Sequence, residues 1–181
     1  MLDRIFRAIR LEAGVFKEVA GDPKYNVEAV ILAVLVAILA ALGQGIGALS
    51  GGRPAVAFFL ELASSLLLGW LLWAVIAYVV GRALGGVGTL SGMTRSLAFA
   101  GAPRFLLLLG FIPCVGWIFR FAAWLLTLVA GVIALRETMG FDTLKALVTA
   151  VLGLVVYVTA SILLGIFFFA PVSALTNFQL R

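Results

Sequence analysis

Residues 29–49, AVILAVLVAILAALGQGIGAL, form a stretch of 21 residues without a charged side chain. An α-helix rises about 1.5 Å per residue, so roughly 20 apolar residues cross a hydrocarbon core about 30 Å thick. The stretch has this length, and Gln44 is its only strongly polar residue. It therefore predicts a transmembrane helix.

The composition extends this interpretation to the whole chain. Of the 181 residues, 64% are hydrophobic and 12% are charged, and the mean hydropathy is +1.22. Ordinary soluble domains have about 45–50% apolar and about 25% charged residues. Because no polar stretch is long enough to form a separate domain, the sequence predicts one all-α polytopic integral membrane protein and excludes a soluble monomer.

Four more apolar stretches follow the first, at residues 55–80, 94–112, 117–135 and 144–170. Glycine and proline separate them, as in Ser50-Gly51-Gly52-Arg53-Pro54. The glycine-rich residues 81–92 match no phosphate-binding motif and predict a flexible connection. Pro103 should kink the third stretch, because proline removes one backbone hydrogen bond. We expect a membrane domain at residues 28–170 with five transmembrane helices, then an outer tail at residues 171–181.

Residues 1–27 contain five of the 13 Lys and Arg residues and no long apolar core. On a helix, the apolar residues of this segment share one stripe about 100° wide. The pattern predicts a short amphipathic helix that lies on the membrane surface and ends at Gly21-Asp22-Pro23. Its expected surface residues are Arg4, Arg7, Arg10, Phe6, Ile9 and Phe16. Alternatively, the stripe packs on this protein's own helices or docks on a partner.

The basic residues are distributed unevenly between the two predicted sides of the membrane. Nine lie on the side of the N-terminus and two, Arg53 and Arg181, on the other, leaving out Arg104 and Arg120 inside the spans. Lys and Arg favour the cytoplasmic side. The N-terminus is therefore predicted in the cytoplasm and the C-terminus outside. A bacterial inner membrane is the expected location, because Arg outnumbers Lys 10 to 3, as in GC-rich genomes.

The chain lacks most residues that carry catalysis or bind metals. It has no histidine, one cysteine (Cys114) and eight carboxylates. Imidazole-based metal sites, internal disulfides and Ser-His or Cys-His nucleophiles are therefore excluded. We expect no catalytic residue, no metal, no cofactor and no enzymatic activity. The net charge of +5 points to anionic lipids rather than to nucleic acid.

Three charged residues, Glu61, Arg104 and Arg120, fall inside predicted spans, and Gln44 reaches a similar depth. A charge at the bilayer centre costs at least about 2.5–3.5 kcal/mol, so it usually has a partner or a function. In one interpretation, Glu61 pairs with one arginine and Arg120 reaches the interface. In a second, these residues form a polar cluster that binds a lipid phosphate or a partner's carboxylate. A proton or ion pathway is the third.

Small residues predict close helix contacts at two places. Gly43, Gly47 and Gly51 are spaced by four, which lets helix backbones approach each other. Pro103 is expected at a helix contact as well. These contacts lie either within this chain or with a second copy or a foreign helix.

Several motifs resemble one known family over about residues 28–170. They are residues 81–86 (GRALGG), residues 94–103 (TRSLAFAGAP), residues 112–117 (IPCVGW) and residues 134–137 (ALRE). With the basic N-terminal segment and five spans, this pattern resembles the Yip-domain family of Rab/Ypt-interacting membrane proteins, in its bacterial branch.

The resemblance implies five spans and a cytoplasmic N-terminus, in agreement with the charge distribution. It implies no catalytic residues, and it gives Arg95 and Pro103 an architectural role. Eukaryotic members of the family assist vesicle traffic and bind prenylated small GTPases through long cytoplasmic N-terminal regions. Only about 27 residues precede the first span here.

Two classes of function follow from these observations. The first is a non-catalytic membrane scaffold or accessory subunit of a membrane assembly, whose partners are the bilayer, anionic lipids and other membrane proteins or further copies of itself. The alternative is a small oligomeric transporter or channel, or a lipid-handling protein, that uses Glu61, Arg104 and Arg120. An intramembrane enzyme would need paired acids or a Ser-Lys arrangement, and the sequence suggests neither.

Overall fold

The computed structural model describes residues 1–49, 52–109 and 115–178, and the side-chain surroundings of all of them except residues 47 and 164–178. This part of the chain contains helices and turns but no strand, so the all-α prediction is confirmed. The α-helices are α1 (Leu2–Ile9), α2 (Ala13–Gly21), α3 (Asn26–Gly47), α4 (Pro54–Leu66), α5 (Trp73–Ala83), α6 (Leu90–Ala100), α7 (Gly116–Met139) and α8 (Thr143–Phe178). The other helical segments are the 3₁₀-helices η1 (Pro23–Tyr25) and η4 (Ala102–Leu109) and the π-helix η3 (Leu67–Leu72).

Four of the described helices are long and apolar enough to cross a membrane. They cover Pro23–Ile46, Pro54–Ala83, Gly116–Met139 and Thr143–Leu163. The second runs through α4, η3 and α5 without a break. This arrangement confirms the predicted polytopic membrane fold.

The third predicted span, residues 94–112, is not one helix. The chain leaves the α-helical conformation after Ala100 and continues as the 3₁₀-helix η4, which contains Pro103. The residue before a proline disfavours the α conformation, so the α-helix ends shortly before Pro103. Together α6 and η4 rise about 32 Å, enough to cross the hydrocarbon core if they were collinear. A fifth crossing remains a prediction.

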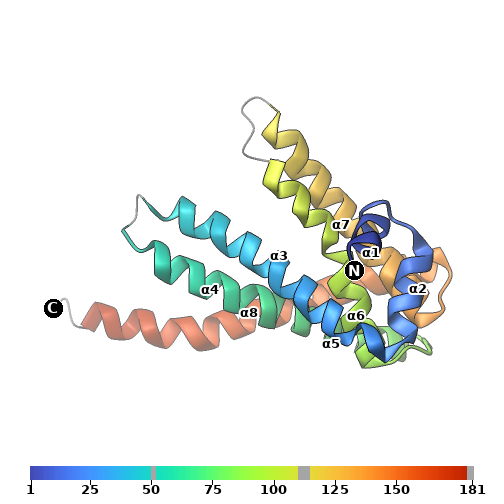
Figure 1. The fold of residues 1–181 in the computed structure, drawn as a ribbon. Coiled ribbons are helices and arrows are strands. Elements are labelled where there is room, and N and C mark those ends of the chain that lie inside the picture. The colour runs from blue at the N-terminus through green and yellow to red at the C-terminus, as the bar shows by residue number, and fades with distance from the viewer. Residues whose placement is uncertain (50–51, 110–114, 179–181) are drawn as a thin grey trace.

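The helices gather at one end of the molecule and diverge from it. Figure 1 shows α1, α2 and the connections at residues 84–89 and 140–142 at this shared end. The α3–α4 hairpin, the η4–α7 hairpin and α8 leave it in three directions, and the C-terminal end of α8 lies far from it (Figure 1). The connections at residues 84–89 and 140–142 therefore lie on the same side of the molecule as α1 and α2 (Figure 1).

The core lies at the shared end, where α2 packs against α6 and α7. Its largest fully buried side chains include Phe16 of α2, Phe99 of α6 and Leu32 of α3. Alanines on facing helices allow the close approach, among them Ala98, Ala100, Ala130 and Ala134. These residues belong to the hydrophobic core of the described part of the chain.

The N-terminal segment differs from the single helix predicted for it. It forms two helices, because the chain turns between α1 and α2 at Leu11, which has a positive φ of 60°. The turn brings residues of both helices against the same core: Ile5, Val15 and Phe16 are all buried. Within the predicted stripe, Ile5 and Phe16 thus pack on this protein's own helices, whereas Leu2 and Phe6 are exposed.

The C-terminal boundary also differs. The last helix was expected to end before Pro171, but α8 continues to Phe178. A proline leaves one carbonyl without a partner yet need not end a helix, particularly in a transmembrane segment.

The glycine-rich connection between α5 and α6 packs closely against the end of α7, contrary to the expectation of a flexible loop. The amide of Val87 donates to the carbonyl of Met139 at 3.1 Å. A β-carbon at Gly88 would lie 2.5 Å from the carbonyl oxygen of Thr138, closer than van der Waals contact permits. This close approach requires glycine at position 88.

We expect Gly88→Ala to destabilise the fold by about 1–3 kcal/mol, because the new methyl group would push the loop away from α7. Thermal unfolding of the purified protein in detergent measures the effect. Gly43→Ala is the matched control: no atom lies within 4 Å of a β-carbon at Gly43, and alanine favours a helix over glycine. Equal unfolding temperatures for the two variants would contradict the prediction.

Candidate functional site

Arg95, in the second turn of α6, is the most extensively hydrogen-bonded side chain at the shared end. Only 4% of it is exposed. Its Nε donates to the carbonyl of Val19 at 2.7 Å, and its Nη2 donates to the carbonyl of Ala20 at 2.6 Å. Its Nη1 donates to Asn26 Oδ1 at 2.7 Å and to Ser91 Oγ at 2.6 Å.

These contacts make Arg95 the cap of α2. The carbonyls of Val19 and Ala20 lie in the last turn of α2, where carbonyls lack intrahelical partners and the helix dipole is negative. A buried guanidinium group donates hydrogen bonds to these carbonyls, and its positive charge offsets the negative end of the dipole. None of the ion pairs in the described part of the chain involves Arg95: its hydrogen bonds go to carbonyl, amide and hydroxyl oxygens, and the Asp22 carboxylate acts on it only at longer range.

A second polar network joins α1, α2, η1 and the start of α3. Glu18 accepts hydrogen bonds from the Tyr25 hydroxyl at 2.7 Å, from Arg7 Nη1 at 3.0 Å and from Arg4 Nε at 3.2 Å. Arg4 also pairs with Glu28 at 3.1 Å, and its guanidinium lies 4.4 Å from the centre of the Tyr25 ring. Arg4 and Arg7 are therefore occupied by carboxylates of this chain rather than free to face anionic lipids.

The contacts of Glu18 change its acidity. The Tyr25 hydroxyl, together with Arg7 and Arg4, lowers the pKa of Glu18 from 4.5 to about 2. Hydrogen bonds and positive charges both favour the ionised carboxylate. Glu18 therefore stays ionised at neutral pH and holds the two N-terminal helices together.

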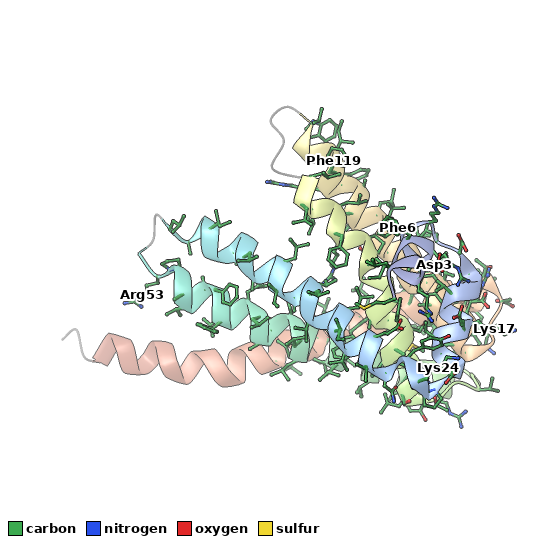
Figure 2. The ribbon with its side chains drawn as sticks, in the orientation of Figure 1. Asp3, Phe6, Lys17, Lys24, Arg53 and Phe119 are labelled. Atoms are coloured by element: carbon green, nitrogen blue, oxygen red, sulfur yellow. The ribbon has the colours of Figure 1, made fainter. Side chains whose placement is uncertain are left out.

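The other residues predicted at the membrane surface are divided between the core and the exterior. Phe16 is fully buried in the protein core, whereas Phe6 is 61% exposed. Ile9 is half-buried, and Arg10 is exposed. Figure 2 shows charged side chains gathered around α1 and α2, where Lys17 and Lys24 are labelled, with Arg53 at the opposite end of the molecule.

The structure does not join the predicted intramembrane charges by ion pairs. Glu61 accepts a hydrogen bond from Ser65 Oγ, four residues later on the same helix, at 2.9 Å. Within the described ranges, no carboxylate lies within 4.0 Å of Arg104 or Arg120. Gln44 and Arg120 are exposed on α3 and α7.

Arg104 instead lines a cavity of about 90 Å³ at the level where α6 gives way to η4. The cavity walls come from α3, α4, η3, α5, α6, η4 and α7. Two hydroxyl side chains, Ser65 and Thr127, line it together with Trp70 and Trp73. Thr127 Oγ1 is buried and has no hydrogen-bond partner in the described part of the chain.

The residues predicted at helix contacts have different surroundings. Pro103 is fully buried, but Gly43 is exposed and has no neighbour within 4 Å of a β-carbon. The close approach of α3 and α4 occurs at Gly45, where a β-carbon would lie 3.4 Å from Phe58 Cβ. The surroundings of Gly47 and the whole of Gly51 lie outside the described residues. In the described ranges no three His, Cys, Asp or Glu side chains come together as a metal site would require.

Comparison with known families assigns the chain. The model of the Yip1 domain matches residues 11–174. The chain belongs to the Yip1 domain family. No curated protein and no solved structure matches it. The matched region of this Yip1 domain includes α2, whereas the sequence motifs placed the resemblance only at about residues 28–170.

The Arg95 cap of this Yip1 domain is difficult to recognise in a sequence. Its partners on α2 are backbone carbonyls, which every residue has. A clearer signal exists for the network at Glu18: residues 1–28 contain five acidic and five basic side chains, a balance typical of internal pairing. A segment adapted mainly to anionic lipids would carry a surplus of positive charge.

We expect Arg95→Gln to destabilise this Yip1 domain by about 3 kcal/mol or more, because it leaves buried carbonyls without donors. Arg95→Lys should recover only part of the loss, since an ammonium group cannot reach all four acceptors. Thermal unfolding and the rate of tryptic cleavage after Lys17 in α2 measure the effect. Arg10→Gln, which changes an exposed arginine, is the control, and an equal loss in both variants would contradict a cap at Arg95.

The network at Glu18 also predicts a dependence of stability on pH. The pKa of Glu18 is about 2 in the folded protein and 4.5 as the ordinary value. Its contribution to stability is therefore complete above pH 4.5 and is lost as the pH falls toward 2. Unfolding temperatures over this range should fall less steeply in Glu18→Gln than in the unchanged protein. Glu12→Gln removes only a contact with Arg7, so the unfolding temperature of this control should keep most of its dependence on pH. An unchanged dependence in Glu18→Gln would refute the assignment of the effect to Glu18.

Proposed function

We propose that this Yip1-family membrane protein is a non-catalytic scaffold or accessory subunit of a membrane assembly. The observation that carries the proposal is the small share of each span that the protein itself covers. In the apolar windows of the four described spans, 33%, 17%, 22% and 17% of the residues are buried. Most of the membrane-facing surface is therefore available to other helices or to lipid.

The exposed surface is distributed over helices that diverge. On α4 it includes Phe59 and Leu60, on α7 Phe121 and Trp124, and on α8 Val155. Helices associate within a bilayer through van der Waals packing and interhelical hydrogen bonds, not through release from water. Separate hairpins with large side chains suit contacts with helices of other membrane proteins.

The shared end provides the rigid part that such a role needs. Arg95 and the network at Glu18 fix α1 and α2 against the spans, so the diverging hairpins start from a defined base. The basic residues concentrated here support a cytoplasmic N-terminus, and the Arg-rich composition supports a bacterial inner membrane.

A second candidate function is lipid handling. The observation that favours it is Arg104, a cation without an ion-pair partner in the described chain, which lines a cavity between the spans. The two functions are compatible, because a scaffold in a membrane can also bind lipid.

Site-specific photo-crosslinking in native membranes tests the scaffold role. A photoreactive residue at Phe59 or at Val155 should form discrete adducts with other proteins, because both side chains are exposed on the spans. The control position is Trp73, whose ring packs at 5.5 Å against Tyr157 of the same chain and should crosslink within it. Adducts with lipid alone at Phe59 and Val155 would contradict the proposal. Adducts only with a second copy would favour the oligomeric transporter or channel instead.

A further inference from the structure

Within the described part of the chain, Arg104 has no ion-pair partner: Glu61 acts on it electrostatically, but from more than 4.0 Å away. Its guanidinium group makes no ion pair and no side-chain hydrogen bond in the part of the chain that the structure describes; only its backbone amide bonds, to Gly101 at 3.0 Å. All eight carboxylate side chains of the sequence belong to described residues. No residue outside the described ranges therefore has a carboxylate side chain that could pair with Arg104. A guanidinium group among membrane-spanning helices requires an anion or water from elsewhere.

The cavity beside Arg104 offers a second polar group that lacks a partner. Thr127 Oγ1 on α7 is buried without a hydrogen bond among the described residues, and its hydroxyl can donate. Two other polar side chains of the wall are already used: Ser65 donates to Glu61 at 2.9 Å, and the Trp70 indole donates to the carbonyl of Thr94 at 2.9 Å. The wall includes the π-helix η3, a conformation that is frequent at functional sites.

The size of the cavity limits what can occupy it. Its volume is about 90 Å³, whereas pockets for drug-sized molecules have about 300–1,000 Å³. A water molecule in the liquid takes about 30 Å³, so the cavity holds one small anionic group or a few waters. A phosphate group has this size, and arginine binds phosphate with strong, directed hydrogen bonds.

The surroundings of the cavity favour an anion that carries apolar chains. The cavity walls include residues of both the α3–α4 and the η4–α7 hairpins. Figure 1 shows these hairpins diverging, and α4 makes no substantial contact with α7 among the described residues. On η4, one turn beyond Arg104, Leu108 is 55% exposed. A free phosphate ion would have to leave water to reach this site, whereas a phospholipid can enter sideways from the bilayer.

We infer that the cavity binds the phosphate group of a membrane phospholipid, with Arg104 as the cationic contact and Thr127 as a hydrogen-bond donor. The acyl chains lie against the apolar side chains between the two hairpins. This inference does not depend on the scaffold role. It leaves Gln44 and Arg120 outside the site, and Glu61 adjoins the site through its hydrogen bond with Ser65.

The test uses the full-length protein, stripped of lipid in maltoside detergent and titrated with phosphatidylglycerol. Native mass spectrometry counts the bound lipid, and thermal unfolding reports its effect. We expect phosphatidylglycerol to bind and to raise the unfolding temperature. Arg104→Gln should weaken binding about tenfold or more, the scale of one charge-assisted contact. The same variant should unfold at a higher temperature than the unchanged protein when lipid is absent, because it removes an unpaired charge.

A second variant blocks the cavity without altering its charge. No atom lies within 4 Å of a β-carbon at Gly131, which lines the cavity on α7, so Gly131→Leu should fit and fill the space. We expect it to weaken lipid binding while the protein remains folded. The matched control is Gly43→Leu on α3, which also has open space but lies away from the cavity. Arg120→Gln controls for the loss of a positive charge elsewhere in a span.

Three outcomes would overturn the inference. Equal binding of phosphatidylglycerol by Arg104→Gln and the unchanged protein would exclude Arg104 as the contact. Equal binding of diacylglycerol, which has the same chains without phosphate, would show that only the chains are recognised. Equal stabilisation by inorganic phosphate alone would make the site one for a free anion, and lipid would then have no special role.

Discussion

The guanidinium group of Arg95 links the two parts of the molecule, the N-terminal helices and the spans. Four of its donors are used, two of them on carbonyls at the end of α2, while the residue itself belongs to α6. An arginine buried without a carboxylate is stable only when hydrogen bonds replace the water it has lost. The position of α2 is therefore tied to that of α6, and neither helix can move without breaking this set of bonds.

The rest of the shared end follows from this position. With α2 in place, Phe16 fills the core between α6 and α7, and Glu18 lies within reach of Arg4, Arg7 and Tyr25. The turn at Leu11 then directs α1 back across the same surface. The apolar and polar contacts of the N-terminal segment thus support one another, and the match of the Yip1 domain from residue 11 onward agrees with α2 being an integral part of the fold.

The spans obey a different constraint, because lipid can cover what protein does not. Close packing at the shared end and divergence beyond it leave large apolar side chains facing the bilayer, which costs nothing there. A charged side chain among the spans, by contrast, raises the free energy of the folded protein unless it is paired. Arg104 lies at the break between α6 and η4, beside a cavity and with no carboxylate within 4.0 Å, so the described side chains do not pair its charge. A scaffold role uses the apolar surface, and a bound phospholipid would satisfy the charge.

The sequence by itself determined that this is an all-helical membrane protein, because residues 29–49 and the later apolar stretches have the length of a bilayer crossing and almost no charge. The interruption near Pro103 was also predictable, since proline acts locally. Only the tertiary structure decided what each side chain meets. Hydropathy does not distinguish Phe16 in a protein core from Phe6 on the surface, and positive charge does not show that Arg4 and Arg7 face Glu18. Two of the partners of Arg95 are backbone carbonyls far away in the chain, which no residue pattern records. That no described carboxylate pairs with Arg104 is likewise a property of the assembled helices.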